Sequence, residues 1–525
     1  MSKQLDNQLT VSGQLDTEDI KRLAATGFKT IVNNRPDGEE ANQPSNAQLQ
    51  ALAEGLGLNW VYLPLTAGQK PDANLAQSFR DVMDTLPRPA HVFCRTGRRS
   101  EMIHQAASAL PAQTNGATHY DVVIVGAGTA GVSVATSILN RSTGLRIALV
   151  DPARTHDYQA AWTLVGAGEF EATQTRKPMV EVIPRGVNWL AKAVESFQPE
   201  HNQITLADGS KLAYDQLVVC PGLKLNWHAI EGLTEALGSN GVTSNYRYDL
   251  AQYTWELVQK TRKGRALFTQ PAMPIKCAGA PQKAMYLSCS NWEEKKVLGN
   301  IEVEMYNAGA VVFGVPTFVP PLMEYIKRYN AQVNFSHNLV KIDGPSKTAT
   351  FEVISPDGEK RRVERTFDMI HVVPPQVAPD FVAKSPLANA AGWVDVDQHT
   401  LQHVRYPNVF GLGDAGSMPN AKTTAAIRKQ APIVANNLIR VRQGLAPQAD
   451  YDGYGACPLT VEKGKVVLAE FSYGGKLAPT FPLNPAVPRR LNWMLKKHVF
   501  PALYWFGALK GREWLTACAK LDSKV

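Results

Sequence analysis

The hydrophobic pattern of the chain is organised around one unit near residue 120. Residues 120–125 form an apolar run, which predicts a short strand that is buried on both faces. A helical pattern follows over 132–140. The turn between them has the spacing G-x-G-x-x-G, supplied by Gly126, Gly128 and Gly131. Such a turn lets the backbone approach a pyrophosphate closely, and the N–H groups that open the helix face the phosphates.

A second apolar run, residues 146–150, ends at Asp151, twenty residues after Gly131. An acidic residue at this distance suits a hydrogen bond to a ribose hydroxyl. Strand, glycine turn, helix, second strand and acid therefore occur in the order of a dinucleotide-binding βαβ unit. We predict a dinucleotide site formed by the three glycines and Asp151.

The pattern before this unit predicts a separate α/β domain over residues 1–112. Short strands alternate there with amphipathic helices. The expected elements are strands at 28–34, 59–65 and 91–94 and helices at 46–55 and 73–86. Residues 113–118 are polar and contain a glycine, so we expect a short linker between this domain and the dinucleotide unit.

The pattern after the linker predicts a two-subdomain flavoprotein fold over residues 119–450. Residues 215–222 resemble the strand-to-turn segment that returns the chain beneath FAD. Residues 406–414 resemble the second flavin motif, in which a strand ends in Gly-Asp and the carboxylate, here that of Asp414, meets the ribityl chain. A helix directed at the isoalloxazine is expected over 421–438. Together with the first fingerprint, these segments favour FAD over a bound nicotinamide.

The middle of this region lacks a second glycine fingerprint. A predicted strand at 265–269 runs into a turn that has Pro271, Pro274 and Pro281 where an NAD(P)H-binding turn has glycines. Proline removes the N–H donors that a phosphate needs. We infer that NAD(P)H does not bind there and that electrons reach the flavin from another donor.

Cys277 is the candidate reactive group of this turn. It follows a strand, precedes a helix expected to begin near Pro281, and has Lys276 beside it. A helix N-terminus and a lysine both lower a thiol pKa and favour the nucleophilic thiolate. The alternative is a small buried packing residue.

Composition narrows the class of protein. The 525 residues are 44% hydrophobic and 19% charged, with a formal net charge of +8, as in a globular protein of two or three domains. Six cysteines over this length do not form a disulfide framework, which indicates free thiols in a reducing compartment. The chain shows no basic groove with interleaved aromatic residues for nucleic acid, no metal-ligand set, no secretory signal and no apolar run of the ~18 residues that a spanning helix needs.

Several segments of residues 119–515 resemble sulfide:quinone oxidoreductases of the type II, mitochondrial-like group. These are 158–166, 274–288, 391–397, 420–423 and 451–458. The resemblance implies an FAD-dependent fold of the pyridine nucleotide–disulfide oxidoreductase kind. The implied FAD contacts are Gly126, Gly128, Asp151, Gln159, Val194 and Asp414. Lys422 and Thr423 are implied to open a helix near the pyrimidine end of the flavin.

The resemblance also implies a reaction. Sulfide would be oxidised to sulfane sulfur carried by Cys277, two electrons would pass through FAD to a membrane quinone, and a small thiol such as glutathione would remove the sulfur. Members of the family use a second cysteine directly after the Gly-Asp motif to form a disulfide or trisulfide with the first. Here Ala415 stands at that position, so the second cysteine is missing.

The other cysteines are weaker candidates for the second redox position. Cys289 lies twelve residues from Cys277 on the expected helix and should point away from the flavin. Cys220 ends another predicted strand and remains open. Cys457 and Cys518 are expected to be packing residues.

Residues 451–525 predict a region that associates with quinone and membrane. Within 489–514, aromatic residues alternate with Arg and Lys, and Pro501 divides two short amphipathic helices. Such helices suit the membrane interface, which predicts a peripheral (monotopic) protein on the cytoplasmic side of the inner membrane. The alternative is a segment docked on its own core or at a dimer interface, and a homo-oligomer stays open.

The N-terminal domain has a candidate site of its own. Cys94 ends a predicted strand, and four residues separate it from Arg99. The backbone N–H groups of such a loop form an anion nest, and its arginines lower the thiol pKa. A protein tyrosine phosphatase needs five intervening residues and a general acid, for which Asp37 and Asp72 are candidates. The shorter loop and the segment 33–39 resemble phosphatase-like, rhodanese-like sulfurtransferase domains.

The sequence is consistent with three functions. The first is an FAD-dependent sulfide:quinone oxidoreductase with an N-terminal sulfurtransferase. The second is an FAD-dependent quinone reductase that uses another donor such as NADH and carries an N-terminal protein phosphatase. The third is a membrane-associated flavoprotein sensor that has lost turnover because Ala415 replaces the second cysteine.

Overall fold

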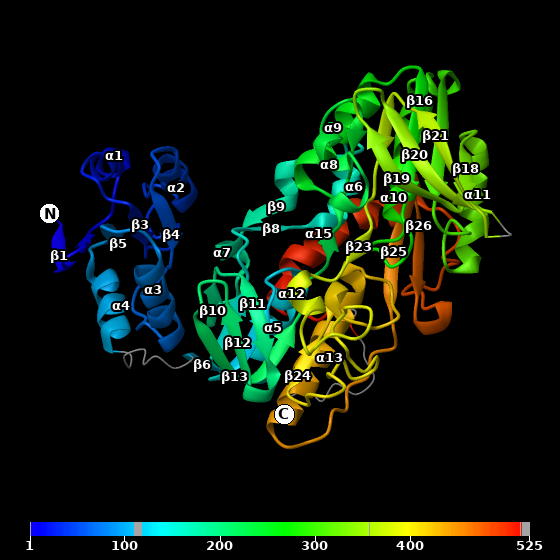
Figure 1. The fold of residues 1–525 in the computed structure, drawn as a ribbon. Coiled ribbons are helices and arrows are strands. Elements are labelled where there is room, and N and C mark those ends of the chain that lie inside the picture. The colour runs from blue at the N-terminus through cyan, green and yellow to red at the C-terminus, as the bar shows by residue number, and fades with distance from the viewer. Residues whose placement is uncertain (1, 110–117, 356–357, 515, 517–525) are drawn as a thin grey trace.

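The structure is a computed structural model, and it describes residues 2–109, 118–355, 358–514 and 516. The chain forms three α/β units, of which the third is inserted into the second. Figure 1 shows the N-terminal unit to one side of the other two. Of the predicted linker 113–118, only Thr118 lies among the described residues, and Cys518 lies outside them.

The N-terminal unit is a three-layer sandwich around one five-stranded sheet. Its strands are β1 (Lys3–Asp6), β2 (Leu9–Ser12), β3 (Thr30–Asn33), β4 (Asn59–Tyr62) and β5 (Ala90–Phe93), in the spatial order β1-β2-β5-β3-β4. β1 is antiparallel to β2, and the other neighbours are parallel. Parallel pairing brings the carboxyl ends of β3, β4 and β5 to one edge of the sheet, where the Cys94 loop begins.

Four helices cover the two faces of this sheet. They are α1 (Thr17–Ala25), α2 (Asn46–Gly55), α3 (Ala73–Thr85) and α4 (Arg98–Ala109). Ile31 and Phe93 pack with α1 and α2, whereas their neighbours Val32 and Val92 pack with α3 and α4. This alternation follows from the two-residue period of a strand, and it explains why the central strands read as continuous apolar runs.

The central unit is built on a seven-stranded sheet. Its strands are β6 (Thr118–Val125), β7 (Ile147–Val150), β10 (Val187–Leu190), β11 (Val194–Gln198), β12 (Gln203–Leu206), β13 (Lys211–Val219) and β24 (Val409–Gly411). β6 lies between β7 and β13 with parallel pairing on both sides. Helices α5 (Thr129–Arg141) and α13 (Thr424–Arg442) pack against each other over the sheet. The predicted helix 421–438 therefore begins three residues later, because the side chain of Thr423 caps it.

The third unit is inserted between β13 and β24. Its five-stranded parallel sheet has the order β15-β22-β16-β17-β18. The strands are β15 (Val242–Thr243), β16 (Gly264–Gln270), β17 (Ile301–Asn307), β18 (Gln332–Phe335) and β22 (Met369–His371). Helices α9 (Tyr248–Lys260), α10 (Ala280–Glu294) and α11 (Val319–Arg328) and a three-stranded sheet, β19 (His337–Asp343), β20 (Thr348–Ile354) and β21 (Lys360–Thr366), complete it.

The chain then returns across both larger units. The hairpin β25 (Gly455–Glu462) and β26 (Lys465–Phe471) packs on α10. It is followed by α14 (Arg490–Met494) and α15 (Phe500–Ala502). π-helical turns follow each of them at Leu495–Val499 and Leu503–Gly507, and a 3-10 turn at Ala508–Lys510 ends the segment. In the described ranges, no helix combines the length and apolar character needed to cross a membrane.

The N-terminal unit docks on the edge strand of the central sheet through α3. Asn74 Nδ2 donates to the Gly186 carbonyl at 2.7 Å, and Ser78 Oγ donates to Asn188 Oδ1 on β10 at 2.7 Å. The Asn188 amide donates in turn to the Tyr120 hydroxyl at 2.7 Å, and Asn188 is completely buried. The edge strand β10 is therefore covered by α3 (Figure 1).

Candidate active site

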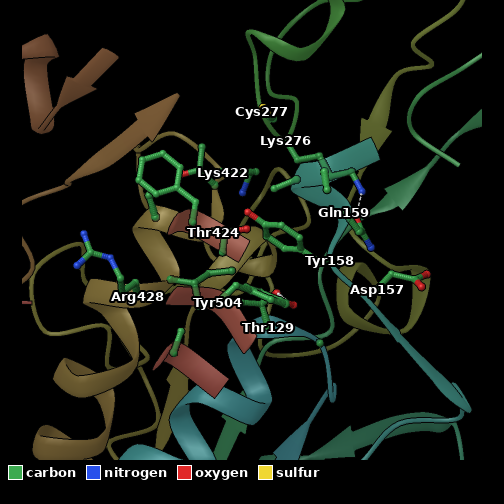
Figure 2. A pocket seen from close by; sticks show the side chains of 18 of the residues that line it. Thr129, Asp157, Tyr158, Gln159, Lys276, Cys277, Lys422, Thr424, Arg428 and Tyr504 are labelled. Carbon is green, nitrogen blue, oxygen red and sulfur yellow. Dashed lines mark hydrogen bonds between the residues drawn. The ribbon is translucent and has the colours of Figure 1, made fainter. Parts of the chain in front are cut away.

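One cavity of about 550 Å³ lies where the glycine turn, the Cys277 turn and the C-terminal segment meet. Figure 2 shows Lys276 and Cys277 on one side of it and Lys422, which precedes α13, nearby. Tyr158 and Tyr504 lie between these residues and the glycine turn. The wall thus combines residues from the central unit, the inserted unit and the C-terminal segment. Among the described residues, no cluster of three or more His, Cys, Asp and Glu side chains could hold a metal ion.

The glycine turn has the shape that a dinucleotide requires. A Cβ on Gly131 would lie 1.8 Å from the Gly126 carbonyl oxygen, so only glycine lets α5 approach β6 this closely. Gly126 has a φ of +103°, and a Cβ there would meet the Cys220 carbonyl at 2.5 Å. Gly128 instead has no protein atom within 4 Å of its Cβ position and lines the cavity. This open space, together with a helix start that no side chain caps, fits a pyrophosphate.

Asp151 lies beside this turn at the end of β7. One carboxylate oxygen accepts from Ala127 N at 2.7 Å and the other from Ala153 N at 2.8 Å. These bonds fix the carboxylate on the cavity wall and leave lone pairs for a ribose hydroxyl. The dinucleotide fingerprint is therefore assembled as the sequence predicts.

The second flavin motif brings a carboxylate and a lysine to the cavity. Burial raises the pKa of Asp414, while Lys422 and Lys276 oppose that shift. Lys422 Nζ donates to the carbonyls of Asp414 at 2.7 Å and Gly416 at 3.0 Å, and burial lowers its pKa to about 8. Thr423 accepts from Ala426 N at 3.2 Å and caps α13, whose first turn opens on the cavity.

Of two further residues predicted to contact the flavin, Gln159 lines the cavity and Val194 does not. Gln159 lies on the cavity wall, and its side-chain oxygen accepts a hydrogen bond from Lys276 Nζ. Val194 is buried on β11 opposite Leu206, and it is not one of the residues that line the cavity. Its side chain packs in the core cluster of the central unit, and its contact with FAD stays a prediction.

Cys277 sits in the turn between β16 and α10 with a φ of +49°. Its N–H donates to the Lys422 carbonyl at 2.9 Å, and the Tyr246 hydroxyl donates to its carbonyl at 3.3 Å. A non-glycine residue in this left-handed region costs about 1 kcal/mol or more, so these bonds hold a conformation that the residue does not prefer. The turn thereby presents the thiol to the cavity.

A second thiol lies against the first, which corrects the sequence-based expectation. Cys457 Sγ is 3.9 Å from Cys277 Sγ, although 180 residues separate the two in the chain. Cys457 is buried in an apolar cluster, as the sequence predicts for a packing residue, but it also places a second thiol beside Cys277, which the sequence analysis does not predict. The hairpin β25–β26 packs on α10 and carries Cys457 to this position. Cys289 and Cys220 are buried elsewhere, and burial raises the pKa of both thiols.

The two thiols have opposite acidity. The hydrogen bond from Cys457 and the nearby Lys283 ammonium hold the pKa of Cys277 well below its usual range, against the effect of burial. The same hydrogen bond and burial raise the pKa of Cys457. The pair therefore holds one negative charge, on Cys277, and one proton, on Cys457.

The lysine at this thiol is Lys283 rather than Lys276. Lys283 Nζ lies 3.1 Å from Cys277 Sγ and 4.0 Å from Cys457 Sγ, in the first turn of α10. Burial lowers the pKa of Lys283, but the two sulfur atoms outweigh that effect and raise it. A second buried lysine, Lys496, donates to the Pro458 carbonyl at 3.2 Å, and burial and Lys283 hold its pKa well below its usual range.

The far end of the cavity is apolar. Its wall there includes Leu468, Phe481, Leu495, Val499, Phe500 and Leu503. One buried carboxylate, Glu470, interrupts this wall and accepts from the hydroxyls of Tyr454 and Thr480, each at 2.5 Å. The C-terminal segment closes the cavity towards the glycine turn, because the Tyr504 hydroxyl bonds Thr129 Oγ1 at 2.9 Å and His156 Nε2 at 2.6 Å.

The same C-terminal stretch has an exposed apolar surface. Its exposed members are Leu477, Phe481, Leu483, Val487, Leu491, Met494, Val499, Phe506 and Trp514. Lys177 lies over the rings of Trp505 and Phe506, with its Nζ 4.9 Å and 5.8 Å from their centroids. Exposed apolar side chains with basic residues beside them are typical of an interfacial surface.

The N-terminal unit contains a second, separate thiol site. Cys94 is 1% exposed at the end of β5, and Gly97 N donates to its Sγ at 3.2 Å. Hydrogen bonds from the loop N–H groups, including those of Thr96 and Ser100, lower the pKa of Cys94 against the effect of burial. The guanidinium of Arg99 lies against this thiol, and its pKa is raised chiefly by Glu39.

Comparison with known proteins shows the family of the larger part of the chain. The chain is 42% identical to the mitochondrial sulfide:quinone oxidoreductase of Dictyostelium discoideum over 394 residues, which are 74% of this chain and 86% of that protein. The mouse mitochondrial enzyme is 37% identical over 75% of this chain and 87% of its own length. The chain belongs to the sulfide:quinone oxidoreductase family.

Family models and a solved structure divide the chain as its fold does. Residues 120–260 match the pyridine nucleotide–disulphide oxidoreductase model, and residues 2–111 match the phosphatase-like domain of beta-lactamase hydrolase-like protein. A beta-lactamase hydrolase-like protein of Xylella fastidiosa is 34% identical over 19% of this chain and 23% of its own length. The sulfide:quinone oxidoreductase structure from Aquifex aeolicus has the same fold, with a TM-score of 0.64, 18% identity and coverage of 76% of this chain and 92% of that one.

Sequence reasoning missed two groups that the fold places at the centre of this family member's site. Lys283 follows Cys277 by six residues, and one turn of α10 brings it back to the thiol. Cys457 lies in the segment 451–458, which carries part of the family resemblance. That likeness was the available indication, but spacing along the chain does not show that a residue 180 positions from Cys277 lies beside it.

Proposed function

We propose that this chain oxidises sulfide to sulfane sulfur at the Cys277–Cys457 pair and passes two electrons through FAD to a quinone. The observation that carries the proposal is a pair of thiols with opposite acidity in a cavity that also contains the dinucleotide turn. FAD is the cofactor of the family, and it supplies a two-electron acceptor that quinone reoxidises. Gly126, Gly128 and Gly131 would hold its pyrophosphate.

The sulfur chemistry begins from the disulfide between the two cysteines. Hydrosulfide enters from the cavity and attacks Cys277, which lines it, so a new S–S bond forms and the Cys277–Cys457 bond breaks. The proton of hydrosulfide ends on Cys457, and Cys277 holds the anionic persulfide. A small thiolate then takes the outer sulfur and leaves the Cys277 thiolate. The loss of two electrons and the Cys457 proton restores the disulfide.

The acidity of the site matches these steps. Lys283 is within 4.0 Å of both sulfur atoms, so it can give a proton to the departing Cys457 and regain one from the new persulfide. The restored ammonium then stabilises the anion on Cys277. The raised pKa of Cys457 keeps the proton there, and the lowered pKa of Cys277 keeps the charge beside Lys283. A small thiol such as glutathione is the proposed acceptor.

The apolar end of the cavity is the proposed quinone site. Apolar residues of the C-terminal segment line it, and the exposed apolar surface lies on the same stretch of chain. A membrane surface would therefore meet the protein beside the cavity, which suits a lipid-soluble substrate. We propose peripheral association with the cytoplasmic side of the inner membrane. A homo-oligomer stays a prediction.

The N-terminal unit is proposed to be a sulfurtransferase. Cys94 is a buried thiol of lowered pKa in a nest of backbone N–H groups, which suits a persulfide carrier. It would accept the sulfane sulfur that forms at Cys277, either directly or from the small thiol. If labelled sulfur reaches Cys94 without an added thiol, transfer is direct.

The test is anaerobic mixing of the purified protein with sulfide while the flavin absorbance is followed. Sulfide should bleach the flavin, and a short-chain quinone should restore the absorbance. NADH, offered in place of sulfide, should not bleach it, because the prolines beside Cys277 replace phosphate-binding glycines. Rapid bleaching by NADH and none by sulfide would reject the proposal.

A further inference from the structure

The arginine of the N-terminal loop is already occupied by a carboxylate. Arg99 Nη1 donates to Glu39 Oε1 at 2.5 Å and Nη2 donates to Glu39 Oε2 at 2.8 Å, a bidentate pair. Arg99 Nη1 also donates to the Leu65 carbonyl at 2.6 Å. Both side chains are largely buried, with 11% and 17% exposure, so little water screens the pair.

A second arginine reinforces this carboxylate. Arg35 is 2% exposed, and its Nε donates to Glu39 Oε2 at 3.1 Å, while its Nη2 donates to Glu40 at 2.6 Å. The hydrogen bond from Arg99 lowers the pKa of Glu39 most, and Arg35 adds to the effect. Glu39 therefore stays ionised between two guanidinium groups.

This arrangement is unsuited to an oxyanion. A phosphoryl or thiosulfate group above a cysteine loop needs the guanidinium fork to bind its oxygens. Here the Nη1 and Nη2 groups of Arg99 already donate to the Glu39 carboxylate. A dianion bound by Arg99 would therefore face that carboxylate. The carboxylate and the dianion carry like charges, so the carboxylate opposes binding.

The candidate general acids of a phosphatase are also engaged in backbone contacts. Asp37 accepts from Asn46 N at 2.7 Å, and Asp72 accepts from Leu75 N at 2.7 Å as the N-cap of α3. Each carboxylate thus accepts a hydrogen bond from a backbone N–H at the start of a helix. These contacts do not favour a proton donor for a phenolate or alkoxide leaving group.

We propose that Glu39 determines the specificity of the N-terminal site: it closes the Arg99 fork, so that Cys94 takes sulfane sulfur from organic persulfides and excludes phosphate esters and thiosulfate. The inference rests on the proposed sulfurtransferase function and names its donor class. In the transfer, the Cys94 thiolate attacks the outer sulfur of R–S–SH. A Cys94–S bond forms, the donor S–S bond breaks, the products are Cys94–S–SH and RS⁻, and the total charge is unchanged.

Oxyanion binding tests the role of Glu39 independently of sulfur transfer. Tungstate is titrated calorimetrically into the full-length FAD-loaded protein and its Glu39→Gln, Glu39→Ala and Glu40→Gln variants. The parent and Glu40→Gln should show no saturable binding at millimolar tungstate, since Glu40 contacts Arg35 and Arg95 rather than Arg99. Both Glu39 variants should bind it at least about tenfold more tightly. Parent binding equal to that of Glu39→Gln would overturn the inference.

Donor preference tests the substrate class. Mass spectrometry follows sulfur on the Cys94 peptide after mixing with glutathione persulfide or thiosulfate. The parent should favour the persulfide by at least about tenfold, and Glu39→Gln should narrow this ratio by accelerating the thiosulfate reaction. Equal parent rates with both donors would contradict the proposed specificity. If Cys94 takes sulfur from neither donor while only the Glu39 variants bind tungstate, the sulfurtransferase function fails but the role of Glu39 stands.

Discussion

At the scale of single residues, the hydrogen bond from Cys457 and the charge of Lys283 together favour the thiolate on Cys277. Its Nζ lies nearer to Cys277 Sγ, at 3.1 Å, than to Cys457 Sγ, at 4.0 Å. Burial by itself would raise the pKa of both thiols, and a cation in a poorly solvated site offsets that cost for the nearer one. The negative charge therefore rests on the thiol that lines the cavity.

Replacing this lysine by methionine should raise the pKa of Cys277. The thiolate is present above the folded pKa, so a higher pKa moves its formation to higher pH. Loss of a close cation shifts a pKa by roughly 1–2 units, which predicts that the pH profile of Cys277 alkylation moves to higher pH by about that amount in Lys283→Met. Peptide-resolved alkylation across pH measures it. Lys260→Met, an exposed position on α9, is the control, and coincident profiles of all three proteins would contradict the role of Lys283.

Replacing Cys457 by serine should separate flavin binding from sulfide oxidation. The site then cannot form an internal disulfide, so the protein should keep FAD but reduce it with sulfide at least about a hundredfold more slowly. Stopped-flow absorbance measures the step. Cys289→Ala is the control, because it removes a different buried thiol, on α10. It should behave as the parent in this assay. Parent-like reduction in Cys457→Ser would show that Cys277 acts alone.

At the scale of elements, the C-terminal helices both close the cavity and expose apolar side chains. Tyr504 is directed inward to Thr129 and His156, whereas the neighbouring Phe506 is 59% exposed. Opposite faces of one short segment thus contact the dinucleotide turn and solvent. This arrangement couples the proposed membrane surface to the quinone end of the cavity.

Acidic side chains on the exposed face of the C-terminal helices should weaken membrane binding and leave the cavity intact. Leu491→Glu with Phe506→Glu removes two exposed apolar side chains and adds repulsion from anionic lipid, so vesicle co-sedimentation should fall by about tenfold or more. Leu445→Glu introduces the same charge at an exposed apolar position outside the C-terminal helices, and it should co-sediment as the parent does. Unchanged sedimentation of the double variant would favour the docked-helix alternative.

At the scale of the whole molecule, the N-terminal unit is fixed to the central unit by a small polar contact. Asn188 on β10 connects Ser78 of α3 to Tyr120 of β6. The relative position of the two thiol sites therefore depends on this contact as well as on the linker. Under the proposed sulfur transfer, joining the two units in one chain would raise the effective concentration of a Cys277 persulfide at Cys94.

Removing the Asn188 side chain should loosen the two units. Asn188→Ala leaves the buried Tyr120 hydroxyl without its donor and costs about 1–3 kcal/mol, which predicts faster proteolysis between the units and a larger radius of gyration in solution. Asn300→Ala, an exposed position, should leave both unchanged. An unaltered scattering profile of Asn188→Ala would mean that other contacts hold the units together.

The sequence by itself determined the features that depend on local order along the chain. The glycine turn with Asp151, the proline-rich turn with Cys277, the Gly-Asp motif with Lys422 and the short Cys94 loop are each contained in a continuous segment. Backbone conformation and spacing decide what such segments can do, so the FAD fold and the family were predictable from them. The same holds for the apolar runs of the central strands.

Only the tertiary structure decided which distant side chains meet. Cys457 reaches Cys277 because the β25–β26 hairpin packs on α10, and Glu39 closes the Arg99 fork because parallel strands bring their following loops to one edge. Val194 stays off the cavity wall because its strand faces the core. Hydrophobic packing sets these positions through surfaces that are distant in sequence and carry no fixed spacing. For this reason the pattern of the chain predicted the cofactor, whereas the proximity of Cys277 and Cys457 required the fold.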